Sequence, residues 1–359
     1  MTPNLLILFD GFSNFRDWAW IMKINVLLIL LFLFLTLCLV TFIIGTRLFK
    51  NFRNSKKKKQ ENLLIDFLNS YLFDEDFEKQ KEIKNFKKNH LNTGLEIKVT
   101  IKEILQFHKN LKGESATALE ELFLKFQLDH FILKDLDKNS WYNTARAIYA
   151  LSELTIEVPV NKIEPYLNDQ RDEVRQQTQL YFIKTAKSNP IQFLDKTKRP
   201  LTTWQQIYIE NALKNFYDGP TPDFARWLNH ELISVVEFSI RLISRYNQFE
   251  NIPKLIPFLN HGKESVKIET IRSLRKLGYE ELLGLIIPNF EKENFLIKKE
   301  ILKTIEQLGD YDDLQKVGPL IAADEWELKI KYLNIERYFL PEETKRINLE
   351  TMLEKELKI

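Results

Sequence analysis

The sequence of 359 residues is poor in the residues and motifs from which catalytic and metal sites are usually built. Its single cysteine, Cys38, excludes a disulfide framework and a cysteine-based zinc site. It contains no Gly-Lys-Ser/Thr phosphate loop, no Gly-x-Ser-x-Gly turn and no His-Glu-x-x-His motif. The histidines are scattered, and no two are spaced by four residues: His90, His108, His130, His230 and His261. We therefore expect no catalytic residue, no cofactor and no metal.

Glycine is also scarce, at ten residues, whereas Leu, Ile, Lys and Glu are abundant. An all-β chain of this length would need many glycine-containing turns, while Leu, Lys and Glu favour helices. A chain of this length can form a large core or one long array of repeated units. The composition therefore predicts an all-α fold.

The charge is nearly balanced overall, at +2, but it is unevenly distributed along the chain. Residues 1–46 are neutral and residues 47–60 carry +7, which leaves −5 on residues 61–359. A domain that binds nucleic acid by neutralising phosphates normally has the opposite sign. We therefore expect no nucleic-acid partner for the large C-terminal part.

Residues 24–45 form an uncharged apolar run, INVLLILLFLFLTLCLVTFIIG. As a helix, this run would span roughly 33 Å, close to the hydrocarbon thickness of a bilayer. A cleavable signal peptide has a shorter apolar core and a small-x-small cleavage site, which is missing here. Lipoprotein processing at Cys38 would need a small residue before it, but Leu37 is there. We therefore predict a transmembrane helix in which Cys38 faces lipid or a neighbouring helix.

The segment that follows, residues 46–60, is predicted to be a basic juxtamembrane linker. Its seven cations should contact the membrane surface: Arg47, Lys50, Arg53, Lys56, Lys57, Lys58 and Lys59. Because positive residues flanking a span are retained in the cytoplasm, we place the rest of the chain there, at a bacterial-type inner membrane. Each cation near anionic headgroups would contribute about 1 kcal/mol. An alternative role for this cluster is recognition of a specific acidic lipid or a nucleic acid.

The stretch before the apolar run, 1–23, is a short N-terminal segment. Its Asn4–Phe9 part is apolar but too short to span a membrane. Met22 and Lys23 directly precede the apolar run, as at the start of many membrane proteins. The true start of the chain is therefore either Met1 or Met22, and the predicted topology is the same for both.

The C-terminal part contains an internal repeat, in which segment 227–246 aligns with segment 258–277. The sequence Trp227–His230 falls on Phe258–His261, and Leu277-Gly278 falls on Leu308-Gly309 one step later. Each unit should contain a short first helix, as at 252–259, and a longer second helix, as at 264–277. The second helix has one apolar stripe, which only neighbouring units can cover, and Gly278 and Gly309 suit left-handed helix caps.

These residues resemble HEAT-type repeats. The segment EPYLNDQRDEVRQQT (164–178) carries the family pattern most clearly, SVKIETIRSLRKLG (265–278) repeats it, and RAIYALSEL (146–154) is similar to a second helix. The resemblance covers about residues 130–340 and implies an α-solenoid, with these residues in repeat packing: Pro165, Leu167, Asp172, Val174, Arg175, Pro257, Leu259, Val266, Ile271, Leu274, Leu277, Gly278, Pro288, Ile297, Leu302, Ile305, Leu308 and Gly309.

Two departures from the HEAT pattern are visible. In the family, a turn aspartate and a helix arginine form ladders between repeats. Asp172 and Arg175 match these positions, but later units lose the acid or replace the arginine with lysine. The repeat period of 31 residues, which is the shift from Trp227 to Phe258, is also shorter than the roughly 40 residues typical of HEAT repeats. We therefore do not expect the regular ladder of that family.

Residues 61–128 should form a helical cap without a clear period, and residues 129–359 the repeats, closed by a helix at 342–359. Core packing is expected for Trp141, Trp204, Trp227 and Trp326, whereas an exposed tryptophan on the concave side of the array would mark a binding hot spot. His230 and His261 occupy equivalent turn positions, which favours a structural role over a ligand pair.

We expect a non-enzymatic scaffold that is tethered to the membrane and binds another protein. A membrane enzyme complex, such as an exopolysaccharide synthase, is one possible partner. The alternatives are a HEAT-like enzyme or nucleic-acid binder, such as a DNA glycosylase or a lyase, and an acidic-lipid-binding module. A groove lined with Lys and Arg around a buried carboxylate would favour the nucleic-acid alternative.

Overall fold

The computed structural model describes residues 19–136 and 140–340. Within these ranges every regular element is an α- or 3-10 helix and none is a strand, which confirms the all-α prediction. The chain divides into two compact units between Leu128 and Asp129. Segment 1–18 and the expected closing helix at 342–359 lie outside the described residues.

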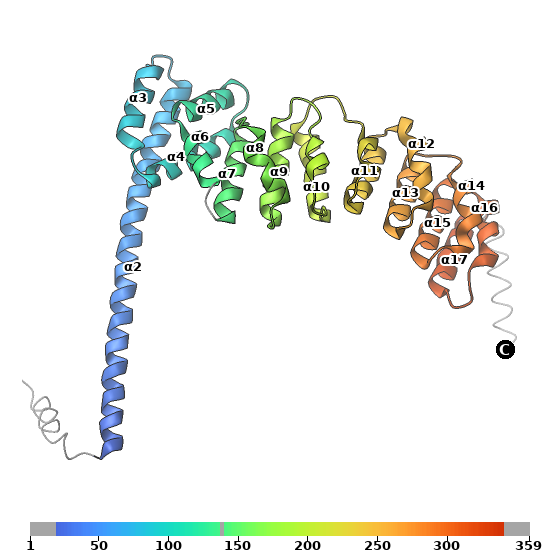
Figure 1. Ribbon diagram of the computed structural model, residues 1–359, viewed down its shortest axis with the longest axis horizontal. Helices are drawn as coiled ribbons and strands as arrows, with labels where there is room; N and C mark the ends of the chain where they lie inside the picture. The colour runs from blue at the N-terminus through green and yellow to red at the C-terminus, as the bar shows by residue number, and fades with distance from the viewer. Residues whose placement is uncertain (1–18, 137–139, 341–359) are drawn as a thin grey trace, which may run out of the picture. The chain divides into compact units, whose positions relative to one another are not determined.

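The first unit contains one very long helix and a small bundle of shorter ones (Figure 1). Its helices are α2 (Trp20–Phe73), α3 (Lys79–His90), α4 (Gly94–Asn110) and α5 (Glu114–Lys125). The buried part of α2 begins at Gln60, whose side-chain Nε2 donates to the His90 carbonyl oxygen over 2.9 Å. From there to its end, α2 is an integral helix of the bundle.

The continuity of α2 differs from the sequence prediction. A span at 24–45, a linker at 46–60 and a separate helical cap from residue 61 were expected, but one helix runs from the span into the cap region. The reason is local: no glycine or proline occurs between Thr46 and Phe73, and Lys, Gln, Glu and Leu all favour helix. The basic segment is therefore a helical stalk of about 21 Å rather than a linker.

Aromatic side chains form the centre of the first bundle. The ring of Phe67 on α2 lies 5.5 Å from Phe77, 4.5 Å from Phe86 and 5.8 Å from Phe126, measured between centroids. Tyr71, one turn after Phe67, is buried and donates from its hydroxyl to the Ala118 carbonyl oxygen over 3.2 Å. These contacts join the end of α2 to the shorter helices.

The second unit continues from α6 (Leu128–Leu136) as alternating short and long elements. The long elements, here called second helices, are α7 (Trp141–Glu153), α9 (Asp172–Thr185), α10 (Thr203–Phe216), α11 (Ile233–Arg245), α13 (Glu264–Lys276), α15 (Phe295–Leu308) and α17 (Trp326–Phe339). Their start positions follow one another at an almost constant interval along the chain. The period thus extends further toward the N-terminus than the sequence match that began at Trp227.

Between the second helices lie short elements, here called first helices, in which an α-turn often passes into a 3-10 turn. They are α8 (Val160–Ile163) with η2 (Glu164–Asn168), η3 (Gln192–Lys196), η4 (Phe224–Trp227), η5 (Phe249–Asn251), α12 (Ile252–Leu255) with η6 (Ile256–Asn260), α14 (Leu282–Ile286) with η7 (Ile287–Lys292), and α16 (Tyr311–Val317) with η8 (Gly318–Leu320).

The repeated prolines account for the change from α to 3-10 geometry. Pro165, Pro257 and Pro288 each stand at the start of a 3-10 element, where proline removes the donor of an α-helical hydrogen bond. All three are exposed, although the HEAT resemblance implied a packing role. They act on the backbone, by turning the chain toward the next second helix.

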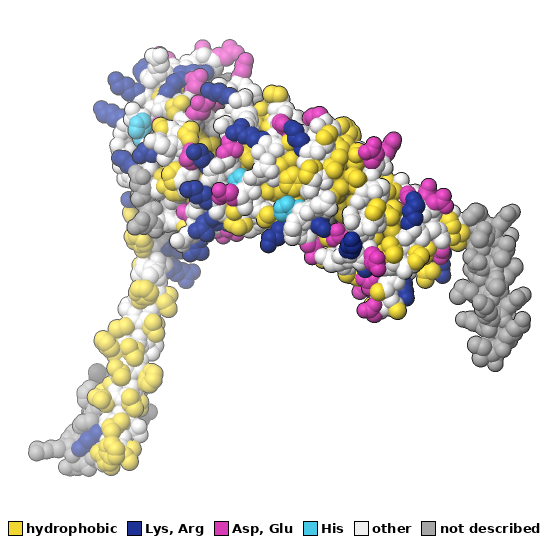
Figure 2. Space-filling view, turned by 45° about the vertical axis from the view of Figure 1, so that its right-hand side comes forward, with side chains coloured by type: hydrophobic (Ala, Val, Ile, Leu, Met, Phe, Trp, Pro, Cys, Tyr) yellow, Lys and Arg dark blue, Asp and Glu magenta, His cyan; other side chains and the backbone are white. Residues whose placement is uncertain are grey.

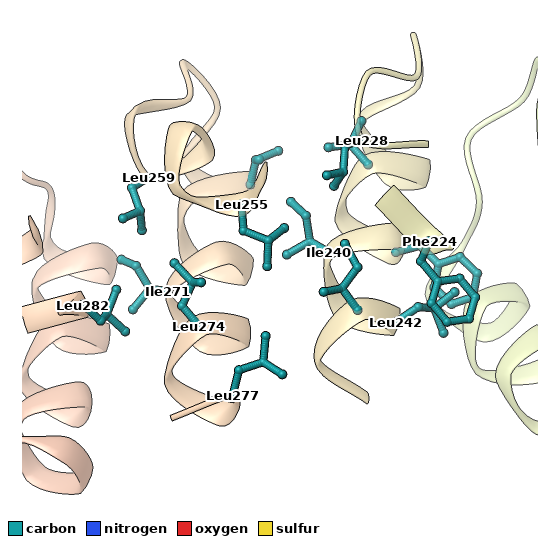
Figure 3. Close-up of a cluster of buried hydrophobic side chains, with 14 of the residues drawn as sticks. Phe224, Leu228, Ile240, Leu242, Leu255, Leu259, Ile271, Leu274, Leu277 and Leu282 are labelled. Atoms are coloured by element: carbon teal, nitrogen blue, oxygen red, sulfur yellow. The ribbon is translucent and has the colours of Figure 1, made fainter. Parts of the chain in front are cut away.

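The core of the second unit is continuous from one repeat to the next. Figure 3 shows Leu255 between α13 and Ile240 of α11, and Leu259 near Ile271 of α13. Most residues assigned to repeat packing are buried: Leu167, Val174, Arg175, Leu259, Val266, Ile271, Leu274, Leu277, Ile297, Leu302 and Ile305. Each second helix therefore buries its stripe against neighbouring units.

Besides the three prolines, three further expected packing positions differ. Leu308 is 39% exposed because it lies at the end of α15. Gly278 has the expected left-handed conformation, with φ of 69°, but Gly309 does not, with φ of −98°. Gly309 is explained by crowding, because a Cβ there would lie 2.9 Å from the Ile305 carbonyl oxygen and 3.0 Å from Leu283 Cδ1. Asp172 is also exposed.

Candidate membrane anchor and protein-binding surface

The apolar part of α2 is exposed on all sides. Its most apolar 18-residue window has a mean hydropathy of 3.2 and none of it is buried. Figure 2 shows hydrophobic side chains along this part of the helix. Two threonine hydroxyls within it are satisfied locally, since Thr36 donates to the Phe32 carbonyl oxygen over 2.7 Å and Thr41 to that of Leu37 over 2.9 Å. This long apolar helix is consistent with a single membrane anchor.

An aromatic residue and a basic cluster flank the apolar part of α2 at its two ends. Trp20 is exposed at the N-terminal end, and Arg47 begins the basic cluster roughly 40 Å further along the axis. That separation matches a bilayer that includes its headgroup regions, where tryptophan is enriched. Of the seven cations, six are exposed, while Lys57 is partly buried and lies 3.7 Å from Glu61. The cluster can therefore face a membrane surface without losing structural contacts.

The tryptophans of the second unit are mostly on the surface, contrary to the expectation of core packing. Trp227 is buried, and its indole Nε1 donates to Asp195 over 2.7 Å. Trp141, Trp326 and above all Trp204, which is 78% exposed, project from their helices. The apolar periodicity of the sequence could not distinguish these exposed tryptophans from core residues, because each lies close in the sequence to buried residues of its helix.

Trp204 belongs to an exposed stripe on α10. Trp204, Ile207, Asn211 and Lys214 are spaced by three or four residues and are all exposed. Ile209 and Leu213, on the opposite side of α10, are buried in the core. The exposed stripe therefore presents a large aromatic and a β-branched side chain on the surface of the second-helix layer. Exposed tryptophan is a typical anchor of protein interfaces.

A polar ladder connects successive second helices at positions that the sequence analysis missed. Arg241 of α11 donates to both carboxylate oxygens of Glu269 on α13, over 3.0 and 3.1 Å, and also to Gln206 Oε1 on α10 over 2.8 Å. One guanidinium thus joins three repeats. Burial lowers the pKa of Arg241, but the bonds and charge of Glu269 outweigh this, and the pKa is raised.

The next repeat contains the same contact one period later. Arg272 of α13 donates to Glu300 of α15 over 3.0 Å, and Arg275 approaches the other oxygen of Glu300 to 2.7 Å. Burial alone would raise the pKa of Glu300, yet the two arginines more than compensate and lower it. We call Arg241–Glu269 and Arg272–Glu300 the first and second rungs. Asp172 and Arg175 instead pair within α9, so they form no rung.

The rungs lie along a groove of about 710 Å³ that crosses α11, α13, α15 and α17. Its lining contains five cations and three carboxylates, together with Ser265, Ile268 and Leu296. The periodic signal for the rungs was present in the sequence, since both pair an arginine with a glutamate 28 residues later. It was hidden by the frequency of charged residues on helix surfaces.

The two equivalent histidines have the structural role that their turn positions favoured. The Leu232 backbone N–H donates to His230 Nδ1 over 3.0 Å, and the Lys263 N–H donates to His261 Nδ1 over the same distance. Each imidazole therefore caps its own turn. Across the described ranges, no group of three or more His, Cys, Asp or Glu side chains has the arrangement of a metal site.

Comparison with known proteins adds little to this description. No family model matches the chain, and no curated protein matches it. A structural match is found to an engineered protein of the Northeast Structural Genomics Consortium, at 13% sequence identity, covering 79% of this chain and 96% of the engineered one. Its TM-score is 0.29, too low to support an argument about either fold or function.

Proposed function

We propose that this chain is a membrane-anchored, non-enzymatic scaffold whose repeat region, a HEAT-like α-solenoid, binds another protein. The membrane part is α2, and the binding part is the exposed surface of the second helices. The observation that carries the proposal is the exposure of Trp204 beside Ile207, on a helix whose other side is buried in the core. Burying such side chains is favourable, and a protein partner can supply that burial.

The anchor and its orientation are supported by the two flanks of the apolar helix. The basic cluster holds seven cations, whereas Lys23 is the described cation at the other end. The side with more cations is retained in the cytoplasm. The scaffold would therefore face the cytoplasm of a bacterial-type inner membrane, where tethering raises its effective concentration near other membrane proteins. A membrane enzyme complex is accordingly a suitable class of partner.

The groove contains the arrangement that would favour the nucleic-acid alternative, namely cations around buried carboxylates. However, Glu269 is bound by Arg241, and Glu300 by Arg272 and Arg275. A carboxylate held by arginines, with its pKa lowered as for Glu300, is a poor general base at neutral pH. These buried acids are better explained as braces between repeats, and the net negative charge of residues 61–359 further disfavours DNA.

The scaffold proposal is tested by affinity purification of the tagged chain from detergent-solubilised native membranes. A reproducible partner protein is expected, and Trp204→Ala should reduce its yield at least several-fold, since hot-spot truncations cost about 2 kcal/mol or more. Phe249→Ala removes another exposed aromatic from the first-helix side and serves as the matched control. Equal recovery with all three chains would contradict the proposed surface, and recovery of no partner would contradict the scaffold.

The basic cluster distinguishes the scaffold from an acidic-lipid-binding module. Replacing Lys56, Lys57, Lys58 and Lys59 with glutamine removes four cations from the stalk. If lipid recognition is the main role, both membrane localisation and partner recovery should fail. The scaffold proposal expects both to persist, because α2 and Trp204 are unchanged.

A further inference from the structure

The charge ladder of the second helices has a third position that lacks its acid. In the first two rungs, an arginine is followed 28 residues later by a glutamate on the next second helix. The same register one period further along pairs Lys303 of α15 with Lys331 of α17. Two cations therefore stand where each earlier rung has a cation and a carboxylate.

These two lysines have little compensation from their surroundings. Lys303 is exposed and has no ion-pair partner in the part of the chain that the structure describes. Lys331 Nζ lies 3.4 Å from Glu306, and the neighbouring Lys299 lies 3.8 Å from Glu327. The Lys299–Glu327 pair is at the surface, where such contacts contribute about 0–1 kcal/mol, and in the long Lys331–Glu306 pair only the lysine is partly buried. Their positive charge is thus available to a bound anion.

Lys303, Lys331 and Lys299 line one end of the groove that also contains the first two rungs. At this end, Leu296 is exposed beside them, one turn before Lys299 on α15. The groove therefore combines weakly compensated positive charge with an uncovered apolar side chain. An acidic ligand with an apolar group would satisfy both features.

We propose that this groove binds an extended acidic segment of a partner protein, with one carboxylate between Lys303 and Lys331 and one apolar side chain against Leu296. The inference rests on the proposed scaffold function, because it specifies the chemistry of its partner. Four neighbouring second helices cover roughly 24–30 Å at ordinary helix spacing, which is about eight or nine residues of extended chain.

A protein segment fits the groove better than a phosphate polymer does. The carboxylates of Glu237, Glu269 and Glu300 are in the lining, and a uniformly charged backbone that crossed the groove would pass them. Phosphates would also leave Leu296 and Ile268 without an apolar partner. A peptide can place acids at the lysines and apolar or neutral residues elsewhere, so its pattern can match the groove.

The test uses the full-length chain in phosphatidylcholine nanodiscs and fluorescence anisotropy. The ligand is a fluorescein-labelled ten-residue peptide that alternates Glu and Leu. We expect saturable binding that weakens with added salt and is lost when every Glu of the peptide is replaced by Gln. Lys331→Glu completes the third rung with Lys303 and should weaken peptide binding at least about ten-fold without reducing helix content.

Lys329→Glu is the matched control, because it makes the same charge change on α17 at a residue outside the groove lining. It should change the affinity less than two-fold. Absence of binding to the original chain, equal binding by Lys331→Glu, or tighter binding of a ten-nucleotide oligothymidylate would each overturn the inference. A partner protein that is still captured from membranes by the Lys331→Glu chain, but not by the Trp204→Ala chain, would contradict binding in the groove. The scaffold proposal would remain supported.

Discussion

Leucine and isoleucine are abundant both in the apolar part of α2 and in the second helices, but they meet opposite surroundings. In α2, Leu28, Leu33 and Leu39 are all exposed, and the helix is apolar on every side. In α13, Ile271 and Leu274 are fully or almost fully buried, while charged residues occupy the other side. The angular distribution of apolar residues around a helix, more than their number, therefore determines what must cover that helix.

A neighbouring helix is enough to bury an apolar stripe on one side of a helix. A helix that is apolar on all sides needs an apolar environment around it, such as the lipid tails of a membrane. Within the repeats each second helix supplies part of the cover for the next, as Figure 3 shows for α11 and α13. For the apolar part of α2, the described residues supply none. The largest effect is therefore expected from making this part of α2 incompatible with lipid.

The largest effect is predicted for paired charges in the middle of the apolar run. Phe34→Lys combined with Leu37→Lys should release the chain from membranes, because each central lysine costs roughly 2.5–3.5 kcal/mol on insertion scales. The measurement is the fraction of chain that sediments with membranes after alkaline carbonate extraction. Leu48→Lys with Phe49→Lys adds the same charge in the stalk and should leave that fraction unchanged. Retention of the first variant would show that α2 is held by protein instead of lipid.

The second prediction concerns the one-sided stripe. Leu274→Ala should destabilise the repeat region by roughly 2–5 kcal/mol, because this fully buried side chain leaves a cavity between α11 and α13. Leu333→Ala makes the same chemical change at a site that is 49% exposed and should alter stability by about 0.5 kcal/mol or less. Urea unfolding monitored by hydrogen exchange of α13 peptides measures both. Similar effects for the two variants would contradict the assignment of the stripe.

The sequence was sufficient to predict the all-α class, the apolar helix and the repeat period, because each depends on a regular pattern over many residues. It was insufficient for the continuity of α2. A basic segment resembles a linker by charge, yet its lysines, arginines, leucine and glutamine favour helix, and no glycine or proline interrupts them. Charge composition and helix propensity gave opposite indications there, and propensity prevailed in the structure.

The candidate surface was less predictable, since it depends on single residues. Trp204 is adjacent to the buried Gln205 and Gln206, so a shift of one position separates a core tryptophan from an exposed one. The rungs likewise involve residues far apart in the chain, whose pairing becomes visible only when the helices are placed side by side. Asp172 and Arg175 matched a family ladder in sequence but pair within one helix.

The smallest predicted effect tests the second rung by pH. Because the pKa of Glu300 is lowered from 4.5 in the folded chain, its contribution to stability should be complete above about pH 4.5. It should be lost as the pH falls through the lowered value, since only the ionised carboxylate attracts Arg272 and Arg275. At neutral pH, Glu300→Gln should cost about 1.5–3 kcal/mol, the range for hydrogen bonds to charged groups.

The two chains should therefore converge in stability on acidification, as hydrogen exchange of α13 and α15 peptides can measure. Glu306→Gln is the matched control on the same helix, because Glu306 is largely exposed and its contact with Lys331 is long, at 3.4 Å. Its cost should be small at every pH. A difference between the original chain and Glu300→Gln that stays constant down to pH 3 would show that shape, and not charge, makes Glu300 important. The rungs would then be packing contacts, and the absence of an acid from the third rung would no longer indicate a site for a bound carboxylate.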